Sequence, residues 1–219
     1  GFTKVQVIDR AVSVTGKPVE EFEAAMADPA AVGLPAEAGG NFEGWFFPAT
    51  YLLEPDDTPA TIVANMVAAT VSNLDALGVA PADRQTVIIK ASLVEREAKA
   101  DADRPKMARA IENRLERDMV LQIDAAVAFG LGRPGTTITN ADMADASNVY
   151  NTYQHKGLPP GPIASPGKAS IEAVLHPAEG DWLFWIAVNL DTGETKFSST
   201  NAEHEKYRAE LRAWQAENP

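Results

Sequence analysis

The chain has 219 residues, of which 45% are hydrophobic and 23% are charged, an ordinary composition for one large or two small globular domains. Its formal net charge of −12 leaves no basic stripe to offset phosphate charge, so no nucleic-acid partner is expected. The sequence contains no cysteine, which excludes disulfides, thiolate metal sites and a cysteine nucleophile.

The chain opens with a stretch whose pattern favours extended structure. Residues 2–14 alternate and are rich in Val and Thr, which predicts one or two strands. Residues 18–27 then predict a short helix, and residues 32–40 predict a loop of small residues. We therefore expect residues 1–40 to form a strand-and-helix portion that packs on a larger domain of residues 41–219.

An aromatic cluster and a series of helices follow. Four aromatic side chains fall within residues 45–51; such clusters usually belong to a core, although a platform for a glycan is an alternative. Thr58 and Pro59 fit the N-cap and first position of a helix, and Gly78 fits its end. Four helices are expected here: one over residues 58–77, one that opens at Pro81 and carries Glu95, one over 103–116 and one over 124–129.

The C-terminal part combines a long loop with a hairpin. Residues 133–168 are rich in Gly, Pro, Asn and Thr, and long ordered loops are often functional. A helix over 168–175 precedes two strands, 182–189 and 194–199, that predict a hairpin, and an amphipathic helix over 201–216 follows. The expected class is α+β: a mainly helical core with strands near the N-terminus and a C-terminal β-hairpin.

Two glutamates at the end of the helix that opens at Pro81 are the first candidates for chemistry. Glu95 and Glu97 follow a strongly apolar stretch, and partial desolvation there disfavours the charged form of a carboxyl. Such an acid can stay protonated near neutral pH and donate its proton. At about 100° per residue the two side chains leave opposite sides of the helix, so they are not expected to act as a pair. A carboxylate partner for Glu95 would come from elsewhere, such as Asp124, and both glutamates could also be the solvated end of a helix.

Other catalytic patterns are missing from the sequence. The three histidines are widely spread and lack an H-x-x-x-H spacing, so no metal site is expected. No G-x-S-x-G nucleophile motif occurs. The prolines within Gly157–Gly161 remove the N–H donors that a phosphate loop needs. We therefore expect neither a metal nor a cofactor.

Tyrosines and prolines distinguish the long loop. Residues 150–153 read Tyr-Asn-Thr-Tyr, and residues 157–167 are rich in proline. Tyr and Asn offer flat apolar faces beside hydrogen-bonding groups, which suits a sugar ring, and a rigid loop loses less entropy on binding. A stiff structural loop whose tyrosines pack inward is an equally good interpretation.

A set of short motifs runs in order through nearly all of residues 40–210. They are Glu43–Pro48, Ala91–Glu97, Asn113–Leu115, Met119–Asp124, Tyr150–Tyr153, Gly157–Gly161, Ile163–Gly167, His176–Pro177, the hairpin from Trp182 to Phe197, and Thr200–Asn201 with His204. Each motif is weak alone, but the ordered set is highly specific. It resembles the endolytic murein transglycosylases of the YceG-like family.

The resemblance implies a lytic transglycosylase whose catalytic domain is residues 41–219. Such enzymes cut the β-1,4 bond between N-acetylmuramic acid and N-acetylglucosamine in peptidoglycan without adding water. The muramic acid C6 hydroxyl attacks C1 and leaves a 1,6-anhydro end. The family's essential glutamate falls on Glu95, which would protonate the leaving oxygen and then accept the C6 hydroxyl proton. One carboxyl serves both steps, so the resemblance removes the need for a carboxylate partner.

The matched motifs also imply substrate-binding residues: Glu97, Gln122, Asn151, Tyr153 and Ser165. The amides and the serine would hydrogen-bond acetamido or hydroxyl groups, the tyrosine would stack on a sugar, and the glutamate would orient the site or the helix. The sequence departs from the family at residues 123–126, where Ile-Asp-Ala-Ala replaces a pattern with hydroxyl side chains. This departure puts substrate contacts at those positions in doubt.

The resemblance also implies a location and partners. We expect the soluble catalytic portion of a protein held in the cell membrane by a single-pass anchor upstream of this fragment, with the domain on the extracytoplasmic side. Peptidoglycan strands would be its substrate and peptidoglycan synthases its partners. Two alternatives stay open: a hydrolytic muramidase that uses the same acid to activate water, and a non-catalytic peptidoglycan-binding module in which Glu95 is only a surface group.

Overall fold

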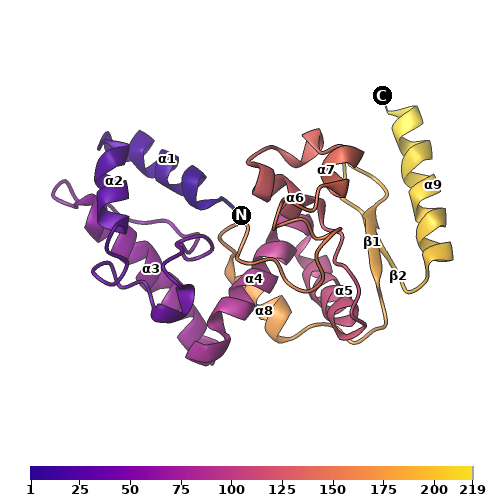
Figure 1. Cartoon of the computed structure of the whole chain (residues 1–219), viewed down its shortest axis with the longest axis horizontal. Helices are drawn as coiled ribbons and strands as arrows, with labels where there is room; N and C mark the ends of the chain where they lie inside the picture. The colour runs from indigo at the N-terminus through magenta and orange to yellow at the C-terminus, as the bar shows by residue number, and fades with distance from the viewer. Residues whose placement is uncertain (219) are drawn as a thin grey trace. The chain divides into compact units, whose positions relative to one another are not determined.

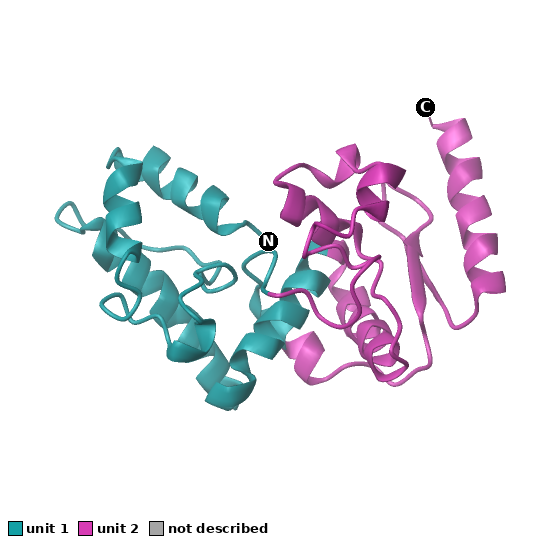
Figure 2. Ribbon diagram, in the orientation of Figure 1, with its two compact units in different colours: residues 1–96, 161–171 teal, residues 97–160, 172–219 magenta. Residues whose placement is uncertain are grey.

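The computed structural model describes residues 1–218, and its contacts divide the chain into two compact units (Figures 1 and 2). Unit 1 consists of residues 1–96 and 161–171, and the rest of the described chain forms unit 2. The expected boundary at residue 40 does not separate these units, because residues on both sides of it belong to unit 1. Residue 219, the last of the predicted catalytic domain, lies outside the described residues.

Unit 1 is built from helices and loops. Its elements are α1 (Lys4–Thr15), α2 (Val19–Met26), the short 3-10 turn η1 (Ala36–Ala38), α3 (Pro59–Ala76), all but the last residue of α4 (Pro81–Glu97), and the first half of α8 (Lys168–Leu175). Helix α1 contacts α2, and α2 contacts α3. The expected helices over 18–27 and 58–77 are therefore confirmed within a residue or two at each end, and the helix that opens at Pro81 and carries Glu95 is confirmed as well.

The predicted N-terminal strand is wrong, because these residues form helix α1. Thr3 and Gln6 make a reciprocal capping box at its start, and Gly16 ends it in the left-handed conformation with φ +67°. The backbone N–H of Lys4 donates to both oxygens of the buried Glu43 carboxylate, at 3.1 and 3.0 Å. These contacts at the helix ends outweigh the preference of the valines for extended backbone. Among residues 1–218, no strand is available with which an extended segment here could pair.

The core of unit 1 lies around the aromatic cluster and α4. Trp45 and Phe46 are fully buried, as the core interpretation predicts, and Trp45 Nε1 donates to Gln85 on α4 at 3.0 Å. Helix α4 buries every residue from Val87 to Val94 except Lys90. The helix therefore emerges from the apolar core at residue 95, so Glu95 lies at the boundary of that core.

Unit 2 combines short helices with a hairpin. Its elements are η2 (Asp101–Asp103), α5 (Arg104–Glu116), α6 (Asp124–Leu131), η3 (Gly135–Thr137), α7 (Asn140–Ala144), β1 (Phe184–Ala187), β2 (Thr195–Ser198) and α9 (Asn201–Glu217), with the second half of α8. The strands pair antiparallel with Phe184 opposite Ser198, and α9 packs on both strands. The expected α+β class and C-terminal hairpin are confirmed.

The long segment over 133–168 is mostly irregular, as expected, apart from η3, α7 and an isolated bridge between Val120 and Lys156. No single helix within residues 1–218 is long and apolar enough to cross a membrane. In the part of the chain that the structure describes, one pair of helices, α3 with α4, reaches that length and composition, and the pair is bent by 105° at its junction.

Candidate functional site

Glu95 occupies the last turn of α4 in unit 1, and its side chain is 16% exposed. One carboxylate oxygen, Oε2, accepts a hydrogen bond from Ser170 Oγ at 2.6 Å and another from the Gly167 N–H at 3.2 Å. The amino nitrogen of Gly1 lies 3.5 Å from the other oxygen, Oε1. The carboxyl is thus largely shielded from water and held by two donors.

Both donors come from the N-terminal end of α8. Gly167 immediately precedes this helix, and Ser170 lies buried in its first turn. Unpaired N–H groups and the helix dipole make such an end favourable for negative charge. The start of α8 therefore stabilises the ionised form of the Glu95 carboxyl, whereas burial favours its neutral form. A group that first donates a proton and then accepts one needs both forms to be accessible.

A buried serine on α4 fixes the loop that leads to these donors. Ser92 Oγ donates to the Ile89 carbonyl at 2.7 Å and accepts from the Ile163 N–H at 3.0 Å. Ile163 begins the loop that ends at Gly167. The helix that carries Glu95 and the loop that supplies its donors are consequently joined one turn below the carboxyl.

Glu95 is predicted from the sequence, whereas Ser170 is not. A serine three residues after a Pro-Gly pair, inside the first turn of an expected helix, is the signal that could have suggested it. Its partner lies 75 residues away along the chain, so no local pattern could have assigned the contact.

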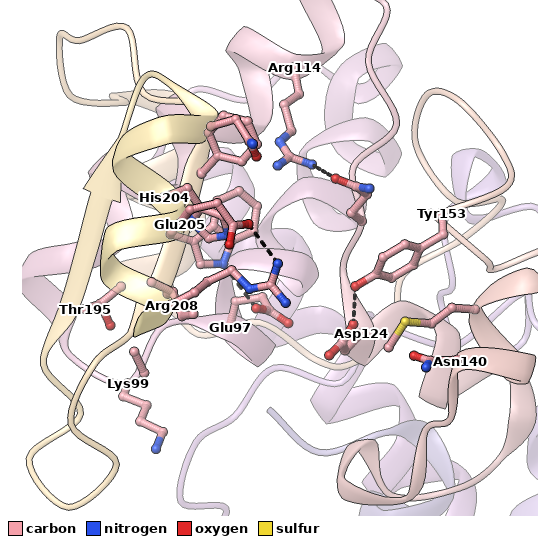
Figure 3. Close-up of a pocket in the computed structure, with 17 residues that line it drawn as sticks. Glu97, Lys99, Arg114, Asp124, Asn140, Tyr153, Thr195, His204, Glu205 and Arg208 are labelled. Atoms are coloured by element: carbon pink, nitrogen blue, oxygen red, sulfur yellow. Dashed lines mark hydrogen bonds and ion pairs between the residues drawn. The ribbon is translucent and has the colours of Figure 1, made fainter. Parts of the chain in front are cut away.

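A separate cleft of about 650 Å³ lies in unit 2 (Figure 3). Its walls come from the end of α4, from α5, α6 and α7, from the hairpin and from α9. The lining residues are Glu97, Lys99, Arg114, Gln122, Asp124, Asn140, Met143, Tyr153, Phe184, Trp185, Ile186, Ala187, Thr195, Asn201, His204, Glu205 and Arg208. Three of the five predicted substrate-binding residues, Glu97, Gln122 and Tyr153, thus line one cleft.

Glu97 reaches the hairpin wall of this cleft. Its Oε2 accepts a hydrogen bond from the indole N–H of Trp185 at 3.2 Å. The two candidate glutamates of α4 therefore have different surroundings, Glu95 at the start of α8 and Glu97 against β1, as their angular separation on the helix predicts.

Tyr153 and Asp124 form a close pair in the cleft (Figure 3). The phenol donates to Asp124 Oδ1 at 2.5 Å. Burial raises the pKa of Tyr153 well above its usual value, and the hydrogen bond to Asp124 raises it further. The phenol is therefore a neutral donor at every physiological pH, and its ring offers a flat face beside a carboxylate.

Arg114 lies beneath the cleft with only 4% of its surface exposed. Its guanidinium stacks against the rings of Phe184 and Trp185, 5.1 and 5.5 Å from their centres, and donates to the side chain of Gln122 at 3.1 Å. Burial lowers the pKa of Arg114, but an arginine stays charged throughout the physiological range. Arg114 lies within the Asn113–Leu115 motif, but no role was predicted for it from the sequence.

His204 on α9 closes another side of the cleft. Its ring stacks on Phe184 with centroids 5.0 Å apart. Burial and the nearby Arg208 lower the pKa of His204, so the ring is neutral at pH 7. Together with Trp185 and Tyr153 it gives the cleft aromatic faces among charged groups, a combination that suits a neutral, hydroxyl-rich ligand.

The other two predicted binding residues lie elsewhere. Asn151 is fully buried, and its amide nitrogen donates to the carbonyls of Asp142, Met143 and Asp145. It therefore holds the loop together rather than lining the cleft. Ser165 is 2% exposed in unit 1 and borders a mainly apolar cavity of about 520 Å³. Their roles in substrate binding stay predictions that this placement does not favour.

Within residues 1–218, no group of three or more His, Cys, Asp or Glu side chains is arranged to hold a metal ion. Unit 1 provides a shielded carboxyl with two donors, and unit 2 provides an aromatic, polar cleft.

Comparisons with known proteins identify several relatives of this chain. The chain is 37% identical over 169 residues to an endolytic murein transglycosylase of Bacillus subtilis (strain 168), covering 75% of this chain and 46% of the relative. It is 32% identical over 188 residues to an endolytic murein transglycosylase of Streptococcus pneumoniae serotype 2, covering 81% of this chain and 34% of the relative. The chain thus spans less than half the length of these curated relatives.

A solved structure shares the fold. The crystal structure of a YceG-like protein from Listeria monocytogenes superposes with a TM-score of 0.77 at 31% sequence identity, covering 94% of this chain and 73% of the other. The model of the YceG-like family matches residues 1–210. The ordered motifs, the fold and this match together establish that the chain belongs to the YceG-like family.

Proposed function

We propose that this chain is the catalytic part of an endolytic murein transglycosylase. The observation that carries the proposal is the shielded carboxyl of Glu95 with its two donors at the start of α8. The names of the relatives support the same activity. The proposed substrate is the peptidoglycan glycan strand, cut at the β-1,4 bond between N-acetylmuramic acid and N-acetylglucosamine.

In the proposed first step, Glu95 acts as a general acid. Its proton passes to the glycosidic oxygen, and the bond between that oxygen and C1 of the muramic acid breaks. Glu95 is then a carboxylate, and positive charge develops on the sugar. General acid assistance of this kind typically contributes ~10²- to 10⁴-fold to the rate.

In the second step, Glu95 acts as a base. The C6 hydroxyl of the same muramic acid attacks C1, its proton passes to the carboxylate, and the 1,6-anhydro ring closes. No water is consumed, and the acid is regenerated. Because the attack is intramolecular, orientation of the C6 hydroxyl supplies much of the remaining acceleration.

The donors from α8 give this cycle its physical basis. Between the two steps the carboxylate is charged and accepts hydrogen bonds from Ser170 and from the Gly167 N–H. Hydrogen bonds to a charged acceptor are about twice as strong as neutral ones. They limit the cost of forming the anion in a place that is largely shielded from water.

We propose that the cleft of unit 2 binds sugar units of the strand. Tyr153, Trp185 and His204 supply aromatic surface, and Glu97 and Gln122 supply hydrogen-bonding groups. Sugars present apolar faces edged by hydroxyl and acetamido groups, and this lining is complementary to them.

Replacing Glu95 by Gln tests the proposal. The amide keeps the size of the side chain but supplies no acidic proton, so turnover of purified peptidoglycan should fall by at least about 10²-fold. Mass spectrometry of the parent digest should show 1,6-anhydro ends. Glu116→Gln is the matched control, since it makes the same change at an exposed residue outside the cleft and should retain the activity.

Each alternative predicts a different result. Reducing ends without anhydro ends would identify a hydrolytic muramidase. Glycan binding without turnover by the parent protein under any substrate condition would identify a binding module. Loss of activity in Glu97→Gln with activity retained in Glu95→Gln would show that Glu97, in the cleft, is the general acid instead of Glu95.

We propose further that the domain works on the extracytoplasmic side of the cell membrane, held by an anchor outside this chain, near peptidoglycan synthases. The proposed substrate supports this location, because peptidoglycan lies outside the cytoplasmic membrane. Fractionation of cells that produce the entire protein, followed by protease treatment of spheroplasts, tests it: the domain should be membrane-bound and accessible to the protease.

A further inference from the structure

Arg114 holds a fixed position beneath the cleft of unit 2. Its Nε donates to the Leu183 carbonyl at 2.6 Å, and its Nη1 donates to the carbonyls of Val120 and Leu121 at 3.0 and 2.9 Å. The same Nη1 donates to Gln122 Oε1 at 3.1 Å (Figure 3). The buried guanidinium is thus held by backbone groups and directs one hydrogen bond to a side chain of the cleft wall.

This contact fixes the polarity of the Gln122 amide. Arginine carries only donors, so the glutamine atom that faces it must be the oxygen. The amide nitrogen, which can only donate, therefore points away from Arg114. Because Gln122 is exposed and lines the cleft, that nitrogen is accessible to a ligand.

The backbone at Gln122 supports the same arrangement. Its φ is +52°, a left-handed conformation that is uncommon for a residue with a side chain. The conformation is held by the Gln122 N–H, which donates to the Thr152 carbonyl at 2.9 Å, and by the Ile123 N–H, which donates to Thr152 Oγ1 at 2.8 Å. Such outliers persist where the surrounding structure enforces them, and they gather at functional sites.

We infer that Gln122 is a specificity-determining donor for the acetamido carbonyl of an N-acetylated sugar, and that Arg114 is the positioning residue that sets its polarity. The inference rests on the proposed glycan substrate and deepens it. A sugar hydroxyl can rotate to suit either a donor or an acceptor, whereas an amide carbonyl can only accept. A donor of fixed polarity is therefore complementary to the acetamido group.

The test measures binding of two neutral tetrasaccharides by titration calorimetry, in the Glu95→Gln background so that no ligand is consumed. Chitotetraose carries an acetamido group at each C2, and cellotetraose carries a hydroxyl there. The protein with Gln122 should prefer chitotetraose. Gln122→Met, which has no donor, and Gln122→Glu, which turns an acceptor toward the ligand, should each lose about tenfold in chitotetraose affinity and leave cellotetraose affinity unchanged.

Two controls sharpen the result. Gln215→Glu makes the same charge change on the exposed face of α9, outside the cleft, and should keep the preference. Arg114→Lys should weaken the preference, and combining it with Gln122→Met should cause no further loss, because both changes remove one contact. A purely structural role for Arg114 would instead weaken binding of both tetrasaccharides.

Retention of the chitotetraose preference in Gln122→Met and Gln122→Glu would overturn the inference and leave the proposed reaction intact. The same holds if the background protein shows no preference at all. The proposed reaction is judged separately, by the anhydro ends of the peptidoglycan digest. Thermal unfolding of each variant, expected within a few degrees of the parent, checks that the binding data come from folded protein.

Discussion

At the scale of single residues, the surroundings of Glu95 combine two opposing influences. Partial burial disfavours the carboxylate, whereas Ser170 and the Gly167 N–H favour it. A group that gives up a proton and takes one back in a single reaction benefits from such a balance. The carboxyl itself could be recognised from its motif, but its donors could not, because they lie 72 and 75 residues away along the chain.

Replacing Ser170 by Ala should lower kcat while leaving KM nearly unchanged. The hydroxyl contacts the acid rather than the proposed substrate, and a hydrogen bond to a charged group is worth ~1.5–3 kcal/mol, or about ten- to a hundredfold in rate. Steady-state kinetics on peptidoglycan measure kcat and KM separately for each variant. Ser198→Ala is the matched control, because Ser198 is equally buried and its Oγ has no hydrogen-bond partner within residues 1–218. An unchanged kcat in Ser170→Ala would show that the hydroxyl plays no part in the reaction.

At the scale of elements, the sequence predicted best where local signals mark both ends of a helix. Thr58, Pro59 and Gly78 delimit α3 closely. The failure at α1 has the opposite cause. Its valines resemble a strand, and its start depends in part on Glu43, which caps it from 39 residues away. The cleft of unit 2 could not be predicted from local patterns either, because its walls come from segments that lie far apart in the sequence.

The cap at α1 gives a stability prediction. Burial raises the pKa of Glu43 and outweighs the backbone N–H groups of Lys4 and Gly44, which lower it. The folded state therefore binds the proton of Glu43 more tightly than the unfolded chain, whose glutamates titrate near ~4.3. Its contribution to stability is complete below that pH and is lost as the pH rises through the higher pKa of the folded state.

Glu43→Gln, which stays neutral, should remove this dependence. Free energies of unfolding in urea, measured from about pH 4 to pH 8, should show the variant gaining on the parent as the pH rises. A difference that stays constant over this range would contradict the assignment. Glu23→Gln on the exposed face of α2 is a suitable control, since it should show no such trend.

At the scale of the whole molecule, the excess of acidic residues is the dominant electrostatic feature. A net charge of −12 on 219 residues creates self-repulsion that favours expanded states. A glycan is compatible with this surface, because a neutral polymer is neither attracted nor repelled over long distances. The charge alone therefore restricts the class of partner without identifying it.

Salt should stabilise the chain as a consequence. Screening becomes effective within about 10 Å at 0.1 M ionic strength, so Tm should rise by about 2–4 °C from low salt, the shift that ~1 kcal/mol produces in a protein of this size. Differential scanning calorimetry in NaCl and in KCl measures the effect. A fall in Tm would show that favourable ion pairs outweigh the repulsion.

The hydroxyl of Ser92 has a consequence for thermal motion. It ties α4 to the loop that begins at Ile163, three residues before Glu95 on one side and four residues before Gly167 on the other. Small displacements of the helix therefore carry the loop with them. We therefore expect the acid and its donors to fluctuate in phase, with a separation that varies less than the position of either one.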